Sequence, residues 1–249
     1  MNSILPETSS TVVPRADLAA AQTSEMFSLL AAHFEGVTRA QFERDLTEKS
    51  HAILITRDER LVGFSTLLAY ETILEQTPVS VVYSGDTIVA SEAWGTTALP
   101  RAWIAAVNGL RATLPHGRYY WLLLTSGFRT YRFLPVFWRE FFPCFERAVP
   151  PESQRLLHHL ARERFGAQYD PGSGLVRFTQ PQRLRAELNH IPEGRAAADP
   201  HVEFFTRRNP DCARGDELVC LTELAPENLT AAGRRMVKPR RDEALRCDC

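Results

Sequence analysis

The chain has 249 residues, of which 44% are hydrophobic and 24% charged, a balance typical of globular proteins. Its formal net charge of -1 gives no reason to expect nucleic acid or a charged membrane surface as a partner. No apolar run approaches the roughly 18 residues of a membrane-spanning helix. The first residues also lack the basic start and apolar stretch of a secretion signal. We therefore expect a cytoplasmic protein.

The five cysteines are odd in number and irregularly spaced: Cys144, Cys212, Cys220, Cys247 and Cys249. This pattern favours reduced thiols over a disulfide framework. Cys247 and Cys249 have no second pair of ligands at the spacing of a zinc site, so we expect no metal site.

The first part of the chain predicts an arm followed by two helices. Residues 1–22 are rich in Ser, Thr and Ala and predict a loose N-terminal arm, ahead of a single domain over residues 23–237. Apolar residues recur at helical spacing over residues 26–34. Thr38, with Gln41 three positions later, forms a capping-box pattern that predicts a second helix over residues 39–49.

The middle of the chain alternates strand and helix patterns. Gly85 interrupts one predicted strand, where a bulge or a close ligand approach is expected. Pro135 suits the start of a short helix. The predicted elements are a hairpin of strands 51–56 and 61–70, a strand 79–89, a helix 99–110, a central strand 119–124 and a helix 135–142.

Beyond residue 150 the patterns are weaker. They predict a helix over 153–165, strands at 174–179 and 217–221, a last helix over 228–237 and a basic C-terminal tail over 238–249. Residues 151–237 are expected to complete or extend the sheet.

The order of these elements resembles the GNAT superfamily of N-acyltransferases over residues 24–145. Local segments are also similar to bacterial GNAT-like proteins, some of which resemble enzymes that attach fatty acyl chains to amines in lipopeptide biosynthesis. The segments that carry this second likeness are Ser84-Gly85-Asp86-Thr87, Trp94-Gly95 and Gly127-Phe128-Arg129-Thr130-Tyr131-Arg132-Phe133-Leu134-Pro135.

The resemblance implies an α+β fold: a mixed, mostly antiparallel sheet flanked by helices, with a C-terminal helical and strand extension. In the family the third and fourth long strands splay apart, and the pantetheine arm of an acyl carrier lies between them. No tightly bound cofactor is implied; acyl-CoA or an acyl carrier protein is the co-substrate. The pyrophosphate of CoA rests on the turn entering the next helix, where this chain keeps only Gly95 of the family pattern. Glu92 would repel a pyrophosphate there, so a carrier protein with a single phosphodiester would be tolerated better.

Three residues are candidates for catalysis. Asp86 is the candidate general base toward an acceptor amine, and Ser84 could orient a water beside it. The alternative is that Asp86 only hydrogen-bonds its neighbours at an irregular strand. The resemblance implies Tyr131 as the acid for the departing sulfur, although a buried phenol also needs a partner for structural reasons.

Other residues are candidates for binding, each with a structural alternative. Hydroxyls after a strand commonly form turns, arginines often lie on a solvated face or pair with a carboxylate such as Glu140, and dense aromatic clusters are usually core. The candidates for the carrier arm are backbone groups of Val89, Ala90, Ser91, Gly95, Thr96 and Thr97 and side chains of Thr125, Ser126, Arg129 and Arg132. The two arginines could hold either the phosphate of phosphopantetheine or an acidic acceptor. The candidates for an acyl tunnel are Phe133, Phe137 and Trp138.

We therefore expect an N-acyltransferase that moves a medium or long fatty acyl chain from a CoA or carrier-protein thioester to an amine of a peptide or small molecule. Two alternatives stay open: a GNAT-fold binding module without catalysis, and an O-acyltransferase acting on a lipid or sugar hydroxyl. The sequence leaves the oligomeric state open and indicates no nucleic-acid partner.

Overall fold

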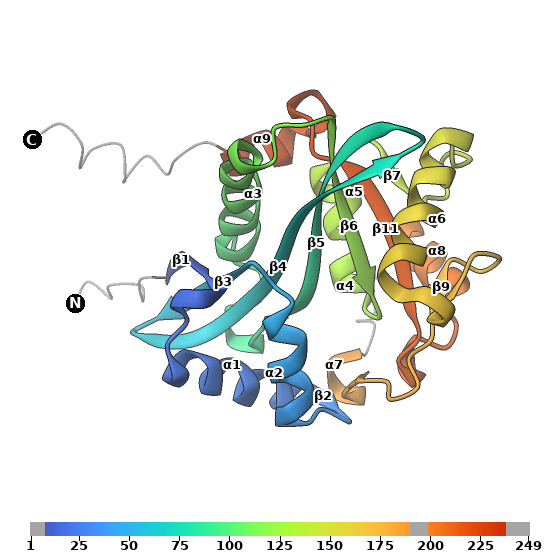
Figure 1. Ribbon diagram of the computed structural model, residues 1–249. Helices are drawn as coiled ribbons and strands as arrows, with labels where there is room; N and C mark the ends of the chain where they lie inside the picture. Colours follow the sequence, from blue (N-terminus) through green and yellow to red (C-terminus); the bar gives the residue numbers. More distant parts are fainter. Residues whose placement is uncertain (1–7, 190–198, 238–249) are drawn as a thin grey trace, which may run out of the picture.

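One mixed sheet organises the molecule in a computed structural model that describes residues 8–189 and 199–237 (Figure 1). Within these residues it has nine strands in the order β1-β3-β4-β5-β6-β11-β9-β8, with β7 beside β11. Among the described strands, only β5 and β6 pair in parallel. The strands are β1 Thr8–Pro14, β3 His51–Arg57, β4 Arg60–Leu74, β5 Thr77–Val89, β6 Arg118–Thr125, β7 Phe141–Phe142, β8 Tyr169–Asp170, β9 Leu175–Val176 and β11 Glu217–Glu223. A separate pair joins β2 (Phe34–Glu35) to β10 (Arg183–Leu184).

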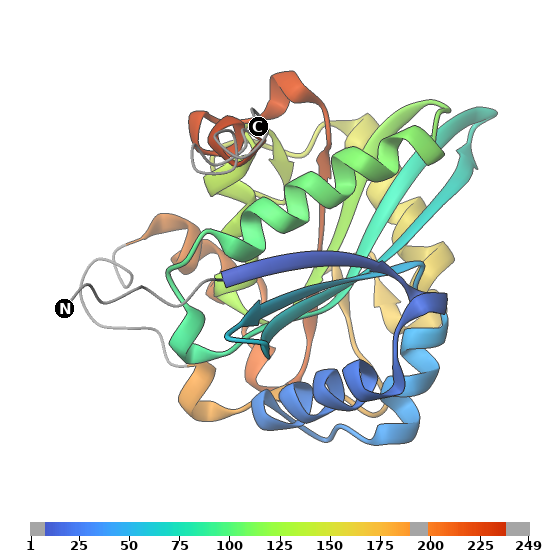
Figure 2. The same cartoon turned by 90° about the vertical axis from the view of Figure 1, so that its left-hand side faces the viewer.

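Helices cover both faces of the sheet, as Figures 1 and 2 show. One face is packed by α3, α4, α5, α8 and α9 around the tryptophans Trp103, Trp121 and Trp138. The opposite face is packed by α1 and α2 over β3 and β4 and by α6 over β5, β6 and β11. The helices are α1 Ala20–His33, α2 Arg39–Thr47, α3 Ala98–Leu110, α4 Phe128–Tyr131, α5 Phe133–Phe137, α6 Pro151–Phe165, α7 Ala186–Asn189, α8 Pro200–Arg208 and α9 Ala231–Val237.

The predicted class is confirmed, because the sheet is mixed, mostly antiparallel and flanked by helices. Local signals explain several elements. The Thr38 hydroxyl accepts a hydrogen bond from the Gln41 amide at 3.2 Å, which caps α2 as predicted. Strand β6 is buried on both faces, as its continuous apolar run requires.

Three predictions are wrong. Residues 8–22 are not a loose arm: β1 pairs with β3 over seven positions, and α1 already begins at Ala20. The helix expected over residues 135–142 is α5, which ends at Phe137, because the chain then extends to pair β7 with β11. The strand expected over 174–179 shortens to Leu175–Val176. Residues 1–7 and the predicted basic tail lie outside the described residues.

Among the described residues, no helix is both long enough and apolar enough to cross a membrane.

Candidate functional site

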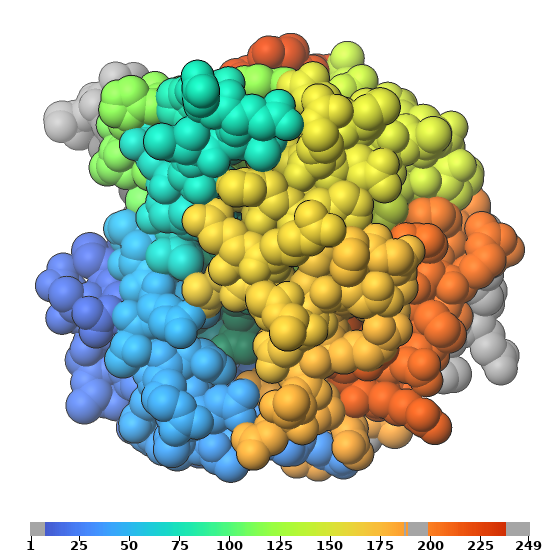
Figure 3. All heavy atoms as spheres, turned by 45° about the vertical axis from the view of Figure 1, so that its right-hand side comes forward, coloured from blue at the N-terminus to red at the C-terminus, as the bar shows by residue number. Residues whose placement is uncertain are grey.

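Strands β5 and β6 stop pairing partway along their length. Their parallel pairing ends at Ser84 opposite Leu123, while β5 continues to Val89 and remains paired with β4. A cavity of about 810 Å³ lies at this divergence, lined by residues 83–89 of β5 and residues 124–130 from the end of β6 onward. In Figure 3 a hollow is visible between α2 and the chain that follows α6. This is the splayed geometry that the GNAT resemblance implies.

A β-bulge places Asp86 in the cavity wall. Ser65 pairs with Thr87 and Leu67 pairs with Ser84, so Thr66 of β4 faces both Gly85 and Asp86. The predicted irregularity at Gly85 is therefore confirmed. Asp86 is partly exposed and lines the cavity. Burial raises the pKa of its carboxyl to about 6, against the lowering effect of Lys49. The group is thus poised to exchange a proton near neutral pH.

Two cations flank the aromatic ring of Tyr83 beside this carboxyl. The Lys49 Nζ lies 5.3 Å and the Arg164 Cζ 5.1 Å from the ring centroid. Lys49 is buried, and its ammonium donates to the Asp45 carbonyl at 3.2 Å. Burial lowers the pKa of Lys49, and Arg164 lowers it further. Arg164 itself pairs with Glu48.

A second carboxyl reaches the cavity from β11. Glu217 is the first residue of that strand, and its neighbour Leu218 pairs with Thr125 at the end of β6. Burial, followed by the charge of Asp86, raises the pKa of Glu217 to about 8. Within the described part of the chain, neither Glu217 nor Asp86 makes a hydrogen bond or an ion pair through its carboxylate.

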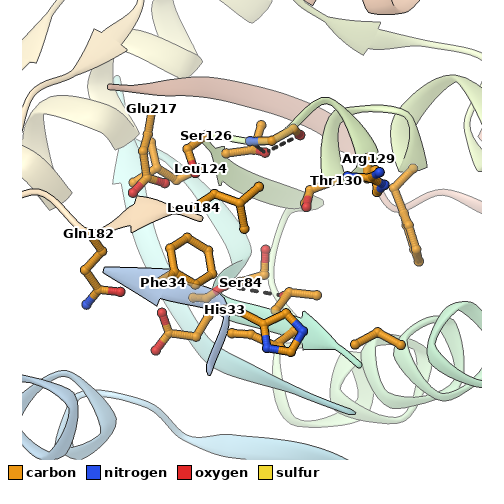
Figure 4. A pocket seen from close by; sticks show the side chains of 18 of the residues that line it. His33, Phe34, Ser84, Leu124, Ser126, Arg129, Thr130, Gln182, Leu184 and Glu217 are labelled. Atoms are coloured by element: carbon orange, nitrogen blue, oxygen red, sulfur yellow. Dashed lines mark hydrogen bonds between the residues drawn. The ribbon is translucent and has the colours of Figure 1, made fainter. Parts of the chain in front are cut away.

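The small sheet of β2 and β10 closes one side of the cavity. Leu184 pairs with Phe34, and both side chains line the cavity with His33 and Gln182. In the view of Figure 4, Leu184 and Phe34 lie between Glu217 and Ser126 on one side and Ser84 and His33 on the other. The wall at this end therefore combines the apolar side chains of Leu184 and Phe34 with the amide of Gln182 and the imidazole of His33.

The turn between β5 and α3 forms the other end. Gly95 has a φ of 77°, a left-handed conformation that favours glycine. Gly95 and Thr96 line the cavity, whereas Ala90, Ser91 and Thr97 do not. The Ala90 amide donates to the Val62 carbonyl, and the Val89 carbonyl accepts from the Trp94 indole at 2.7 Å. These two backbone groups are already occupied.

The predicted polar binding residues lie on and around α4. Thr125, Ser126, Arg129 and Arg132 all line the cavity. The Thr125 hydroxyl donates to the Gly127 carbonyl and accepts from the Gly127 amide, which is the turn-forming alternative. The Arg129 guanidinium lies 4.5 Å from the ring centroid of Trp94. Arg132 pairs with Asp199 at 2.8 Å.

Tyr131 lies apart from this group. It is fully buried, it does not line the cavity, and its hydroxyl donates to the Pro143 carbonyl at 2.9 Å. Ser84 lines the cavity, but its hydroxyl oxygen accepts a hydrogen bond from the Trp121 indole at 2.8 Å. Of the predicted tunnel residues, Phe133 lines the cavity, whereas Phe137 and Trp138 pack in the core.

No model of a known protein family matches the chain, and no curated protein sequence matches it significantly. Among solved structures, a probable N-acyltransferase of unknown function from Enterococcus faecalis is 16% identical, with a TM-score of 0.41, over 54% of this chain and 33% of that one. This chain thus spans about a third of that protein's length.

Two further solved structures are similar at the same level. An acyl-CoA N-acyltransferase from Pseudomonas aeruginosa is 17% identical, with a TM-score of 0.38, over 48% of this chain and 80% of that one. A GNAT family N-acetyltransferase from Escherichia coli in complex with CoA is 13% identical, with a TM-score of 0.38, over 52% and 68% of the two chains.

Sequence reasoning missed two residues that approach Asp86 from other elements, Lys49 and Glu217. Lys49 follows α2, and Glu217 begins β11, far along the chain. Nothing in the sequence marked Lys49 as a site residue, because it is the last residue of a predicted helix that carries many other charged residues. Glu217 carried one weak signal, a carboxylate directly before an apolar strand.

Proposed function

We propose that the protein is an N-acyltransferase in which an amine attacks an acyl thioester held between β5 and β6. The observation that carries this proposal is the divergence of the two strands beyond Ser84 and Leu123, with the Asp86 carboxyl in the wall of the resulting cavity. A strand edge released from pairing leaves backbone groups free to hydrogen-bond an extended arm such as pantetheine.

The carrier arm would enter past the turn before α3. Gly95 and Thr96 line this end, and the Arg129 guanidinium, which lies 4.5 Å from the ring centroid of Trp94, also donates to the Leu188 carbonyl. An arginine held by an aromatic ring is suited to a phosphate. CoA and an acyl carrier protein both present a phosphate on pantetheine, so either is a possible acyl donor at this position.

The acceptor would meet the thioester near Asp86. An amine is protonated at neutral pH and must lose a proton before it attacks, and a carboxylate with a pKa of about 6 can accept that proton. The acceptor would be an amine of a peptide or small molecule. Leu184, Phe34 and Phe133 provide apolar wall that favours an acyl chain of medium or greater length.

A donor panel tests the proposal. The purified protein is incubated with acyl-CoAs and acyl carrier proteins from acetyl to hexadecanoyl, with and without a mixture of amines. Free thiol and intact mass are then measured. We expect amine-dependent thiol release with a preferred chain length. Binding without turnover would favour a non-catalytic module, transfer only to alcohols would favour an O-acyltransferase, and no thioester binding would refute the proposal.

A further inference from the structure

The departing sulfur of a thioester needs a proton, and Tyr131 is poorly placed to supply it. A proton donor must come within hydrogen-bond reach of the atom it protonates. The Tyr131 hydroxyl is enclosed in the core and already donates to Pro143. The donor is therefore to be sought among the groups that line the cavity.

Glu217 lines the cavity from the start of β11. It stands beside the end of β6, through the pairing of Leu218 with Thr125, and it faces the cavity that the diverging strands create. Asp86 lines the same cavity from β5. Neither carboxyl has a hydrogen bond or ion pair with any other residue of the described chain, so both are available to a ligand.

From these placements, we infer that Glu217 is the acid that protonates the leaving sulfur, and that Asp86 and Glu217 work as a base and an acid in one cavity. The inference rests on the proposed acyl transfer. It assigns a catalytic role to a residue outside the segments that resemble the GNAT superfamily.

The surrounding charges shift the pKa values of the two carboxyls to different extents. The charged and titratable groups at this end of the cavity come from α2 and the turn after it, from β5 and from α6: Asp45, Glu48, Lys49, Tyr83 and Arg164. Lys49 lowers the pKa of Asp86, whereas the shift of Glu217 comes from burial and from Asp86 itself. With values of about 6 and about 8, Asp86 is mainly ionised and Glu217 mainly protonated at pH 7.

The reaction balances with these two groups. The Asp86 carboxylate takes one proton from the acceptor ammonium, and the freed lone pair forms the C–N bond to the thioester carbon. The C–S bond then breaks, its electron pair moves to sulfur, and the sulfur receives the proton of the Glu217 carboxyl. The excess proton on the new amide nitrogen returns to the Glu217 carboxylate. Asp86 releases its proton to solvent as the products leave.

Tyr83 is the competing donor. Its phenol also lines the cavity, but burial raises its pKa well above the ordinary value, and its ring is in contact with both Lys49 and Arg164. An acid is most effective when its pKa is near the working pH, which favours Glu217.

Leaving-group replacement tests the inference. An alkyl thioester such as acyl-CoA is compared with an acyl arylthioester, whose more acidic thiol departs without protonation. Glu217→Gln should slow amine acylation by the alkyl thioester roughly 10²-fold and lose the decline in rate above pH 8. With the arylthioester it should stay within a few-fold of wild type. Asp86→Asn should be slow with both donors, and Tyr83→Phe, the matched control, should be normal with both.

Results that contradict the role of Glu217 can be told apart from results that contradict acyl transfer itself. A Glu217→Gln variant that is folded by circular dichroism and slow with both donors, or fast with both, would overturn the acid role while leaving the acyltransferase intact. Tyr83→Phe rescued by the arylthioester would move the role to Tyr83. A wild-type protein that consumes neither of these thioesters nor any carrier-protein thioester of the donor panel would instead refute the proposed function, and the inference with it.

Discussion

The side chain of Lys49 packs against Gly85 so closely that a Cβ on Gly85 would lie 2.5 Å from the Lys49 Cε. The same Cβ would lie 2.6 Å from the Thr66 hydroxyl oxygen, a buried atom without a hydrogen-bond partner in the described chain. Glycine at the bulge therefore lets the lysine reach the neighbourhood of Asp86, where its charge opposes the effect of burial on the carboxyl.

Gly85→Ala should displace the flexible end of the Lys49 side chain and force the Thr66 hydroxyl to move, because both obstructing atoms belong to side chains and not to the backbone. With less compensation from the ammonium, the pKa of Asp86 rises and the acidic limb of the pH–rate profile moves to higher pH. The profile of kcat/KM measures this. Gly109→Ala in α3 is the matched control, since no atom lies within 4 Å of the added Cβ, and it should raise stability by about 0.5–1 kcal/mol. An unchanged acidic limb would contradict the role of Lys49.

Lys49→Met removes the charge while it keeps most of the apolar side chain. We expect roughly ten-fold lower activity than wild type at pH 6 and nearly normal activity at pH 8, where Asp86 is ionised in both proteins. The double variant with Gly85→Ala should be no less active than Lys49→Met alone, since both changes remove the same interaction between Lys49 and Asp86. Fully additive losses would show that Gly85 acts in another way.

Tyr131→Phe separates a structural role from a catalytic one. Loss of the hydrogen bond to the Pro143 carbonyl should lower the free energy of unfolding by about 1 kcal/mol. The rate of acyl transfer at saturating substrate should stay within two-fold of wild type. Chemical denaturation and steady-state kinetics measure the two effects. A 10²-fold loss of kcat in a protein of normal stability would restore Tyr131 as the acid.

Arg129 and Arg132 should differ in their effect on donor binding. Arg129 lies over the Trp94 ring at the cavity and donates a hydrogen bond to the neutral Leu188 carbonyl, whereas Arg132 forms an ion pair with the Asp199 carboxylate. Arg129→Ala should raise KM for the acyl donor about ten-fold, and Arg132→Ala should raise it less. Equal effects on KM would place the phosphate elsewhere.

The partly buried carboxylate of Glu217 should lower the stability of the folded protein at alkaline pH. Its folded pKa of about 8 lies above the ordinary value of 4.5, so the folded protein holds the proton more tightly. Stability is therefore lost as the pH rises from about 4.5 to about 8. Glu217→Gln should melt at least about 2 °C above wild type at pH 8.5 and at the same temperature at pH 4. A lower Tm at pH 8.5 would show that the carboxylate has a stabilising partner.

Local signals in the sequence were sufficient for much of the fold. The cap at Thr38, the hairpin of β3 and β4 and the irregularity at Gly85 each depend on neighbouring residues and were correctly predicted. Strand β1 was missed because its pattern is largely exposed, and its pairing with β3 is a long-range contact. The segment after Pro135 was misjudged because pairing with β11, also long-range, outweighs its helical signal.

Only part of the candidate site could be predicted from the sequence. Asp86 could be singled out as a carboxylate in an apolar strand beside a glycine. Lys49 and Glu217 reach it from distant parts of the chain, and only the packing of α2 and β11 brings them together. Tyr131 shows the converse, because the residue that the resemblance implied is turned into the core.

The most direct test of the account is a paired measurement on Asp86→Asn. Binding of acyl-CoA and of acyl carrier protein is measured by calorimetry, and amine-dependent thiol release is measured at pH 7, each beside wild type. The account predicts a dissociation constant within a few-fold of wild type and a rate at least about 10²-fold lower. A variant that binds and turns over like wild type, or a wild-type protein that binds no thioester, would contradict it.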